Sequence, residues 1–127
     1  MNFKLVYSFD MGYIDAYCTF GWNQTFMASM ITKYAQGPAF YRWKGEILVS
    51  TYAGEGYGDA FFAGLKEMLA AQGIPIVLAP ALTTYSDNAQ QKTGSSLNSI
   101  ASGMVSNYPS IDGFLNCLLF VPCTLAN

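Results

Sequence analysis

Short apolar runs alternate along the chain with longer segments in which hydrophobic residues recur every three or four positions. The short runs are bounded by Gly, Pro or Asp, which is typical of strands. They cover residues 3–9, 47–52, 74–82 and 111–115. The periodic segments predict amphipathic helices. Their apolar stripes cover residues 26–34, 61–69 and 97–105. Because strands that follow helices pair in parallel through right-handed crossovers, the pattern predicts an α/β fold built of parallel βα units.

Residues that typically begin or end helices support this assignment of strands and helices. Asp59 precedes the second helical stripe and is expected to be its N-cap, whereas Gly37 and Gly73 follow the first two stripes as stop signals. The runs around Val49 and Val77 are continuous rather than alternating, which is typical of strands covered on both faces. No linker divides the chain, so we expect a single globular unit.

Two carboxylates follow the first two predicted strands. In parallel α/β folds the functional loops leave the carboxyl ends of the strands, and Asp10 and Glu55 lie at such ends. A pair of carboxylates there can act as acid and base on a glycosidic bond. In the alternative interpretation, Asp10 caps the following turn and Glu55 is a solvated loop residue beside two glycines. Asp112, which precedes Gly113, is expected to serve a turn rather than a site.

Three tyrosines lie near the same strand ends, namely Tyr52, Tyr57 and Tyr85. Their rings can stack on sugars in a binding site, or they can pack into the core and its rim. The glycine-rich stretch 54–58 stands between a strand and a helix, but it matches neither phosphate-binding fingerprint, and Glu55 would repel an anion.

Composition narrows the chemistry further. The 127 residues are 52% hydrophobic and only 11% charged, with a net charge of −2, so no basic surface is available for nucleic acid. The chain has no histidine, which excludes Ser-His-Asp and Cys-His relays and histidine metal sites. No cofactor or metal is therefore expected, and carboxylates remain the leading catalytic groups.

The three cysteines, Cys18, Cys117 and Cys123, form neither a C-x-x-C pair nor an even disulfide framework. Asn23 begins an N-glycosylation sequon, which is usable only in the secretory pathway. The amino terminus shows no signal peptide pattern, and the apolar stretch 115–125 is about half the roughly 20 residues needed to span a bilayer. We therefore expect no membrane insertion.

Several linked segments carry a resemblance to a known family. They are Phe3-Lys4-Leu5-Val6-Tyr7-Ser8-Phe9-Asp10-Met11, Gly37-Pro38-Ala39-Phe40-Tyr41-Arg42-Trp43-Lys44-Gly45-Glu46, Leu48-Val49-Ser50-Thr51-Tyr52-Ala53-Gly54-Glu55 and Ile111-Asp112-Gly113-Phe114. In order and spacing, they resemble the fungal α-1,3-glucanases, or mutanases, of glycoside hydrolase family 71. The likeness covers residues 3–116.

This resemblance implies a secreted (β/α)8 barrel that hydrolyses α-1,3-glucan of the fungal cell wall with inversion at the anomeric carbon. Asp10 matches an active-site carboxylate of the family, and Glu55 matches a substrate-binding or supporting glutamate. Placed on that barrel, the chain resembles an incomplete TIM barrel of about strands three to six, with residues 1–116 as the partial barrel domain and 117–127 as a divergent carboxyl-terminal tail.

The departures from the family pattern lead to further expectations. The family's first two strands and its late Asn-Asp-Tyr-Gly-Glu-Ser type motif, which supplies the main acidic pair, have no counterpart here. We therefore expect a truncated chain that is inactive alone, whose open sheet edges favour a homodimer. Two alternatives stay open, namely a non-catalytic glucan-binding or interaction remnant, and a small flavodoxin-like cofactor domain.

Overall fold

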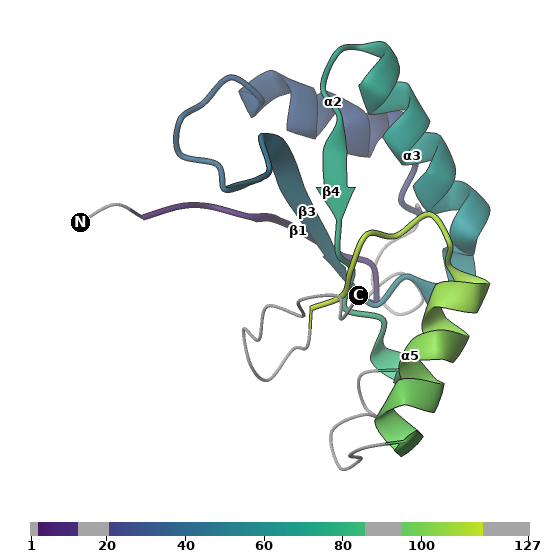
Figure 1. Cartoon of the computed structure of the whole chain (residues 1–127). Coiled ribbons are helices and arrows are strands. Elements are labelled where there is room, and N and C mark those ends of the chain that lie inside the picture. Colours follow the sequence, from purple (N-terminus) through teal and green to yellow (C-terminus); the bar gives the residue numbers. More distant parts are fainter. Residues whose placement is uncertain (1–2, 13–20, 86–94, 116–127) are drawn as a thin grey trace.

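The computed structural model describes residues 3–12, 21–85 and 95–115, and it shows a mixed α/β fold with a small open sheet and helices (Figure 1). The elements in chain order are β1 (Tyr7–Asp10), α2 (Gln24–Tyr34), β2 (Arg42–Trp43), β3 (Glu46–Tyr52), the 3₁₀ turn η1 (Glu55–Tyr57), α3 (Asp59–Ala71), β4 (Ile76–Leu78) and α5 (Ser95–Asn107). The predicted helices are confirmed, as are the first three predicted strands, although β1 and β4 are shorter than expected.

The sheet is centred on β3. Strand β1 pairs with β3 in parallel, with Tyr7 beside Val49 and Asp10 beside Tyr52. Strand β4 pairs in parallel with the other edge of β3. The parallel strands β1, β3 and β4 therefore lie side by side in chain order, as consecutive βα units would (Figure 1).

The core fills the space between one face of this sheet and the helices α2 and α3 (Figure 1). The strands contribute Phe9, Ile47, Val49, Ile76 and Leu78, and the helices contribute Met27, Ile31, Phe62, Leu65 and Leu69. Burial of each large apolar side chain stabilises the fold by about 1.5–3 kcal/mol. This packing holds the strand ends in place.

The opposite face of the sheet is more polar and more open. Because successive side chains of a strand point to opposite faces, Ser8 and Asp10 lie on the side away from buried Phe9, and both are exposed. Leu48 and Val77 are half-buried, so the prediction of strands covered completely on both faces holds only in part. The face that carries Asp10 is therefore accessible.

The predicted strand at residues 111–115 does not form, so that prediction is wrong. The segment does run beside β4, since the Asp112 amide donates to the Leu78 carbonyl at 2.8 Å and the Leu115 amide to the Pro80 carbonyl at 3.1 Å. The Leu78 amide, however, donates to the Asp112 side-chain Oδ2 at 2.9 Å. A carboxylate thus takes the place of the backbone acceptor that a regular ladder would supply.

A short hairpin that the hydrophobic pattern did not predict precedes β3. Strand β2 pairs antiparallel with β3, with Trp43 opposite Glu46. The connecting residues Lys44 and Gly45 have φ of 51° and 89°, the two positive values that a type I′ turn requires. Two-residue strands carry too little periodicity to be seen, and Lys-Gly is not among the favoured pairs for this turn.

Of the two sequence signals at the ends of α3, the glycine after the helix is confirmed and the predicted N-cap is not. Helix α3 ends at Ala71, and Gly73 follows it with a φ of 75°. The Gly73 and Ile74 amides donate to the Ala70 and Leu69 carbonyls in a Schellman motif. The prediction that Asp59 caps α3 is wrong. Gly58 is the N-cap, and the Asp59 carboxylate binds elsewhere.

Candidate functional site

The carboxyl ends of the three parallel strands meet in one row. Asp10 lies beside Tyr52 in the β1–β3 register, and Tyr52 forms a parallel bridge with Ala81 beyond β4. The Met11 amide donates to the Tyr52 carbonyl at 2.9 Å, so the pairing continues past Asp10. The prediction that Asp10 and Glu55 follow neighbouring parallel strands is confirmed by this topology.

Asp10 carries the most accessible carboxylate of this row. Its Oδ1 accepts the Gly12 amide at 3.1 Å, as in an Asx turn, and the side chain is exposed. Its backbone carbonyl accepts the Trp22 Nε1–H at 2.8 Å. Asp10 therefore does cap the following turn, and it presents Oδ2 without a hydrogen-bond partner among the described residues.

Glu55 is anchored rather than solvated. Its Oε1 accepts the Thr84 amide at 2.7 Å and the Thr83 hydroxyl at 3.2 Å, and its carbonyl accepts the Tyr108 hydroxyl at 3.1 Å. The carboxylate thus ties the end of β3 to the chain that follows β4. These partners lie far along the sequence, so no local signal could have shown them.

The turn between β3 and Glu55 is conformationally unusual. Ala53 and Gly54 have φ of 57° and 116°, and the Thr51 hydroxyl donates to the Ala53 carbonyl at 2.7 Å. A Cβ at Gly54 would lie 3.2 Å from Met11 Sδ and from Phe62 Cζ, so the close approach requires glycine. A non-glycine residue in the left-handed region is the kind of backbone strain that clusters at functional sites.

The three predicted tyrosines differ in what they contact. Tyr52 is 45% exposed, and its ring lies against Gly12, where a Cβ would be 3.4 Å from Cδ1 and Cε1. Tyr57 packs on Phe61 with ring centroids 4.7 Å apart. Tyr85 uses its hydroxyl to accept the Asn107 Nδ2–H at 2.7 Å. Tyr52 is therefore the tyrosine of the three that offers an open ring beside Asp10.

Tyr108, which the sequence did not single out, joins the segment after α5 to the turn that begins with Glu55. Burial raises the pKa of its hydroxyl, and nearby Tyr85, Glu55 and Asp59 raise it further. The hydroxyl consequently stays protonated and continues to donate to the Glu55 carbonyl at neutral pH.

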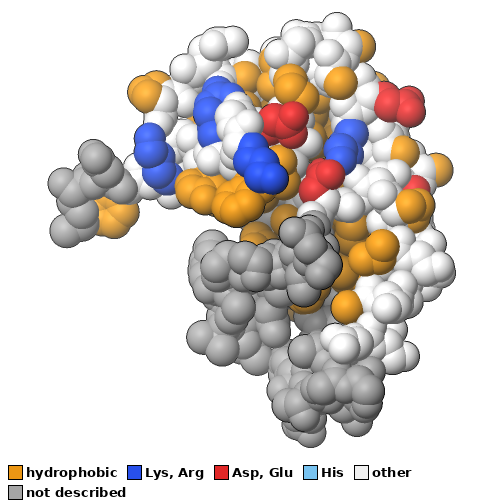
Figure 2. All heavy atoms as spheres, in the orientation of Figure 1, with side chains coloured by type: hydrophobic (Ala, Val, Ile, Leu, Met, Phe, Trp, Pro, Cys, Tyr) orange, Lys and Arg blue, Asp and Glu red, His pale blue; other side chains and the backbone are white. Residues whose placement is uncertain are grey.

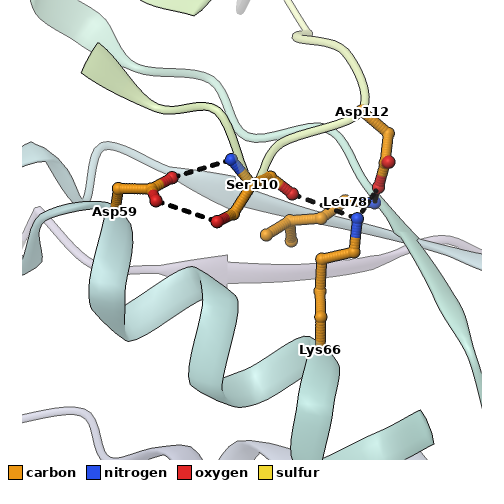
Figure 3. A network of polar contacts seen from close by, with 5 residues as sticks. All are labelled: Asp59, Lys66, Leu78, Ser110 and Asp112. Atoms are coloured by element: carbon orange, nitrogen blue, oxygen red, sulfur yellow. Dashed lines mark hydrogen bonds and ion pairs between the residues drawn. The ribbon is translucent and has the colours of Figure 1, made fainter. Parts of the chain in front are cut away.

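A second group of acids lies between α3 and the segment after α5 (Figure 3). The Asp59 carboxylate accepts the Ser110 amide at 2.9 Å and the Ser110 hydroxyl at 2.8 Å. Lys66 Nζ donates to the Ser110 carbonyl at 3.0 Å and to Asp112 Oδ2 at 2.6 Å. We call these four residues the Asp59–Asp112 network. Both acids are engaged in holding the chain together, which makes them structural.

The remaining predicted site residue is Asn23, which is exposed. Its Oδ1 accepts the Phe26 amide at 2.7 Å and caps α2. Cys18, Cys117 and Cys123 lie outside the described residues. Within the described ranges no three acidic or cysteine side chains gather as a metal site would need, and no helix there is long and apolar enough to cross a membrane.

Comparison with known proteins gives a consistent assignment. The family model described as glycosyl hydrolase family 71 matches residues 1–115. The glucan endo-1,3-alpha-glucosidase agn1 of Schizosaccharomyces pombe is 32% identical over 124 residues, covering 91% of this chain and 26% of that protein. The chain thus spans about a quarter of the length of this relative. No solved structure matches this chain. The chain belongs to glycosyl hydrolase family 71.

Proposed function

We propose that this chain is part of a hydrolase that cleaves α-1,3-glucan, and that the polysaccharide binds where β1 and β3 end. The observation that carries the proposal is the exposed Asp10 carboxylate in register with the exposed ring of Tyr52. A carboxylate beside a flat aromatic surface suits a neutral sugar ring. The glucan linkage is taken from the name of the Schizosaccharomyces pombe relative.

We propose further that residues 1–116 belong to a (β/α)8 barrel. Three features support this: β1, β3 and β4 are parallel, they neighbour each other in chain order, and α2 and α3 cover the same face (Figure 1). The exposed face with Asp10 would then point into the barrel, where such enzymes hold their active residues at the carboxyl ends of the strands. The proposed tail at 117–127 lies outside the described residues.

In an inverting reaction, one carboxylate removes a proton from water as the water oxygen attacks the anomeric carbon. A second, protonated carboxyl gives its proton to the departing O3 of the next sugar as the C1–O3 bond breaks. We assign Asp10 to one of these two roles, because its side chain is exposed and its Oδ2 has no hydrogen-bond partner among the described residues. We assign Glu55 to support and substrate orientation, because Thr83 and Thr84 already bind its carboxylate.

Three of the other described acids already bind groups within the fold. Among the described acids, Asp59 and Asp112 are engaged in their own network, and Glu55 is anchored. We therefore propose that the isolated chain binds glucan without measurable hydrolysis, with Tyr52 as the direct stacking contact and Tyr57 and Tyr85 as supports. A homodimer through the open sheet edges would be a second way to complete the site.

The setting follows from the family. We propose an extracellular or cell-wall location, with the polysaccharide as the partner and no cofactor. In that setting the exposed Asn23 would carry an N-glycan. Expression in a eukaryotic secretory host tests this, with Asn23→Asp as the control because aspartate keeps the helix cap and removes the sequon.

Co-sedimentation of the purified chain with insoluble α-1,3-glucan tests the proposed binding, beside reducing-sugar release from the same samples. We expect retention on α-1,3-glucan but not on cellulose, about tenfold weaker retention for Tyr52→Ala, and unchanged retention for Asp10→Asn. A folded chain that neither binds nor cleaves the glucan would contradict the proposal. Hydrolysis that disappears in Asp10→Asn would establish Asp10 as catalytic and refute the inactivity of the isolated chain.

A further inference from the structure

Trp22 lies between the two segments that carry the candidate carboxylates. Its side-chain Nε1–H donates to the backbone carbonyl of Asp10 at 2.8 Å. Its backbone amide donates to the Tyr57 hydroxyl at 2.9 Å. One residue from the segment before α2 therefore bonds both to the end of β1 and to the turn that begins with Glu55.

The two ends of this bridge are rigidly held. The Trp22 ring stands edge-on to buried Phe9, with centroids 5.4 Å apart and planes at 74°. On the other side, the Tyr57 amide donates to the Gly54 carbonyl at 3.1 Å. A displacement of Tyr57 would therefore move the turn that holds Glu55, and a displacement of Trp22 would move the Asp10 backbone.

Close packing around Tyr57 supports the same conclusion. A Cβ at Gly21 would lie 3.3 Å from the Tyr57 hydroxyl, so the chain before Trp22 approaches the phenol closely. The half-buried Tyr57 accepts a hydrogen bond from the Trp22 amide through this hydroxyl. Tyr57 is thus placed to hold the site rather than to stack on substrate.

We propose that Trp22 and Tyr57 are positioning residues that set the separation between Asp10 and Glu55. This inference rests on the proposed function, in which these two side chains act on the same sugar. Catalytic and binding groups must be held to within a fraction of an ångström, and such precision comes from supporting hydrogen bonds. We call the Asp10–Trp22–Tyr57 bonds the brace.

Two conservative variants test the brace one bond at a time. Tyr57→Phe keeps the ring on Phe61 and removes the hydroxyl that accepts the Trp22 amide. Trp22→Phe keeps an aromatic ring beside Phe9 and removes the donor to Asp10. Tyr85→Phe is the matched control, since it also removes a single tyrosine hydroxyl, one that is bonded to Asn107.

The first readout needs no ligand. In nuclear magnetic resonance spectra of the 127-residue chain, Tyr57→Phe should speed hydrogen exchange of the Trp22 indole N–H at least about tenfold, because a broken bond on one side loosens the other. The Trp43 indole serves as the internal reference. Tyr57→Phe and Trp22→Phe should each shift the amide signals of both residues 10–12 and residues 54–57, whereas Tyr85→Phe should leave residues 10–12 unchanged. Variants that shift only the signals next to the substituted residue would overturn the proposal.

The second readout is affinity for soluble α-1,3-linked glucose oligosaccharides. We expect each brace variant to weaken binding about three- to tenfold. Tyr7→Phe is the control for binding, because it removes a tyrosine hydroxyl that donates to the Met30 carbonyl of α2, and it should leave the affinity unchanged. Lower thermal stability with unchanged amide signals at residues 10–12 and unchanged affinity would mean a purely structural role and would also overturn the brace. If the wild-type chain binds no oligosaccharide, the proposed function fails, and the amide and exchange data still decide whether the brace exists.

Discussion

Asp59 and Asp112 differ from Asp10 in how many hydrogen bonds their carboxylates accept within the protein. Asp59 and Asp112 each bind a backbone amide and a side-chain donor, Ser110 or Lys66, across the gap between α3 and the segment after α5 (Figure 3). Asp10 receives the Gly12 amide alone among the described residues, and its side chain faces solvent. A carboxylate whose acceptor capacity is used within the protein serves the fold, whereas one left accessible can act on a ligand.

Charged side chains of both signs lie close together on one face of the molecule. Figure 2 shows one side on which Lys and Arg side chains gather close to acidic ones and to an apolar area. Among the described residues Lys66 and Asp112 form an ion pair, and their side chains are 28% and 39% exposed. Such a partly exposed pair contributes little by charge alone. The larger contribution of Asp112 comes from accepting the amide of fully buried Leu78.

The largest effect on stability should come from Asp112→Ala. The substitution leaves the Leu78 amide without its acceptor and removes the ion pair of Lys66, which keeps its hydrogen bond to the Ser110 carbonyl. We expect a loss of about 2 kcal/mol in the free energy of unfolding, measured by urea denaturation. Asp10→Ala is the matched control and should change this free energy by less than about 0.5 kcal/mol. Equal losses in the two variants would abolish the distinction between structural and accessible acids.

Ser110→Ala should have an intermediate effect. It removes the hydroxyl that donates to Asp59 but keeps the backbone amide bond at 2.9 Å. The expected loss is about 1 kcal/mol, since one of two hydrogen bonds to the carboxylate remains. Asp59→Asn offers a second view of the same contact, because the amide side chain can still accept one of the two bonds. An unchanged free energy of unfolding in both variants would show that the contact between Asp59 and Ser110 contributes nothing to stability.

Alkaline pH should lower the free energy of unfolding by a smaller amount, through the hydroxyl of Tyr108. The pKa of Tyr108 is raised above 10.0 in the folded chain by burial and by neighbouring Tyr85, Glu55 and Asp59. A raised pKa means that the stabilisation is complete below pH 10 and is lost as the pH rises through the folded pKa. Unfolding followed from pH 8 to 11 should therefore show decreasing stability above about pH 10.

Tyr108→Phe should remove part of this alkaline decrease. Part should remain, because burial also raises the pKa of Tyr7. An identical pH profile in wild type and Tyr108→Phe would contradict the role given to the Tyr108 hydroxyl.

The hydrophobic pattern predicted most of the regular structure because burial drives it. The stripes containing Ile31 and Leu65 repeat at the helical period, the run around Val49 is short and continuously apolar, and the structure buries all three residues. The failures have a different physical origin. At 111–115 the Asp112 carboxylate, rather than a backbone carbonyl, accepts the Leu78 amide, and the β2 hairpin turns at Lys44, which has a positive φ.

The candidate site was predictable only in part. The positions of Asp10, Tyr52 and Glu55 follow from strand ends and parallel pairing, which are properties of local sequence and topology. The anchoring of Glu55 by Thr84 and the bonds from Trp22 join residues far apart in the chain. Such contacts leave no periodic signal and emerge only from the folded structure.

The most direct test of the central claim, that Asp10 is the carboxylate that acts on the sugar, uses a charged sugar analogue. The transition state of glycoside hydrolysis carries positive charge at the sugar ring, which a protonated iminosugar such as 1-deoxynojirimycin imitates. Binding would be measured by calorimetry for wild type, Asp10→Asn and Asp112→Asn, with folding checked by circular dichroism. We expect Asp10→Asn to weaken iminosugar binding at least about tenfold and Asp112→Asn to leave it unchanged. Equal iminosugar affinity in wild type and Asp10→Asn would contradict this role of Asp10.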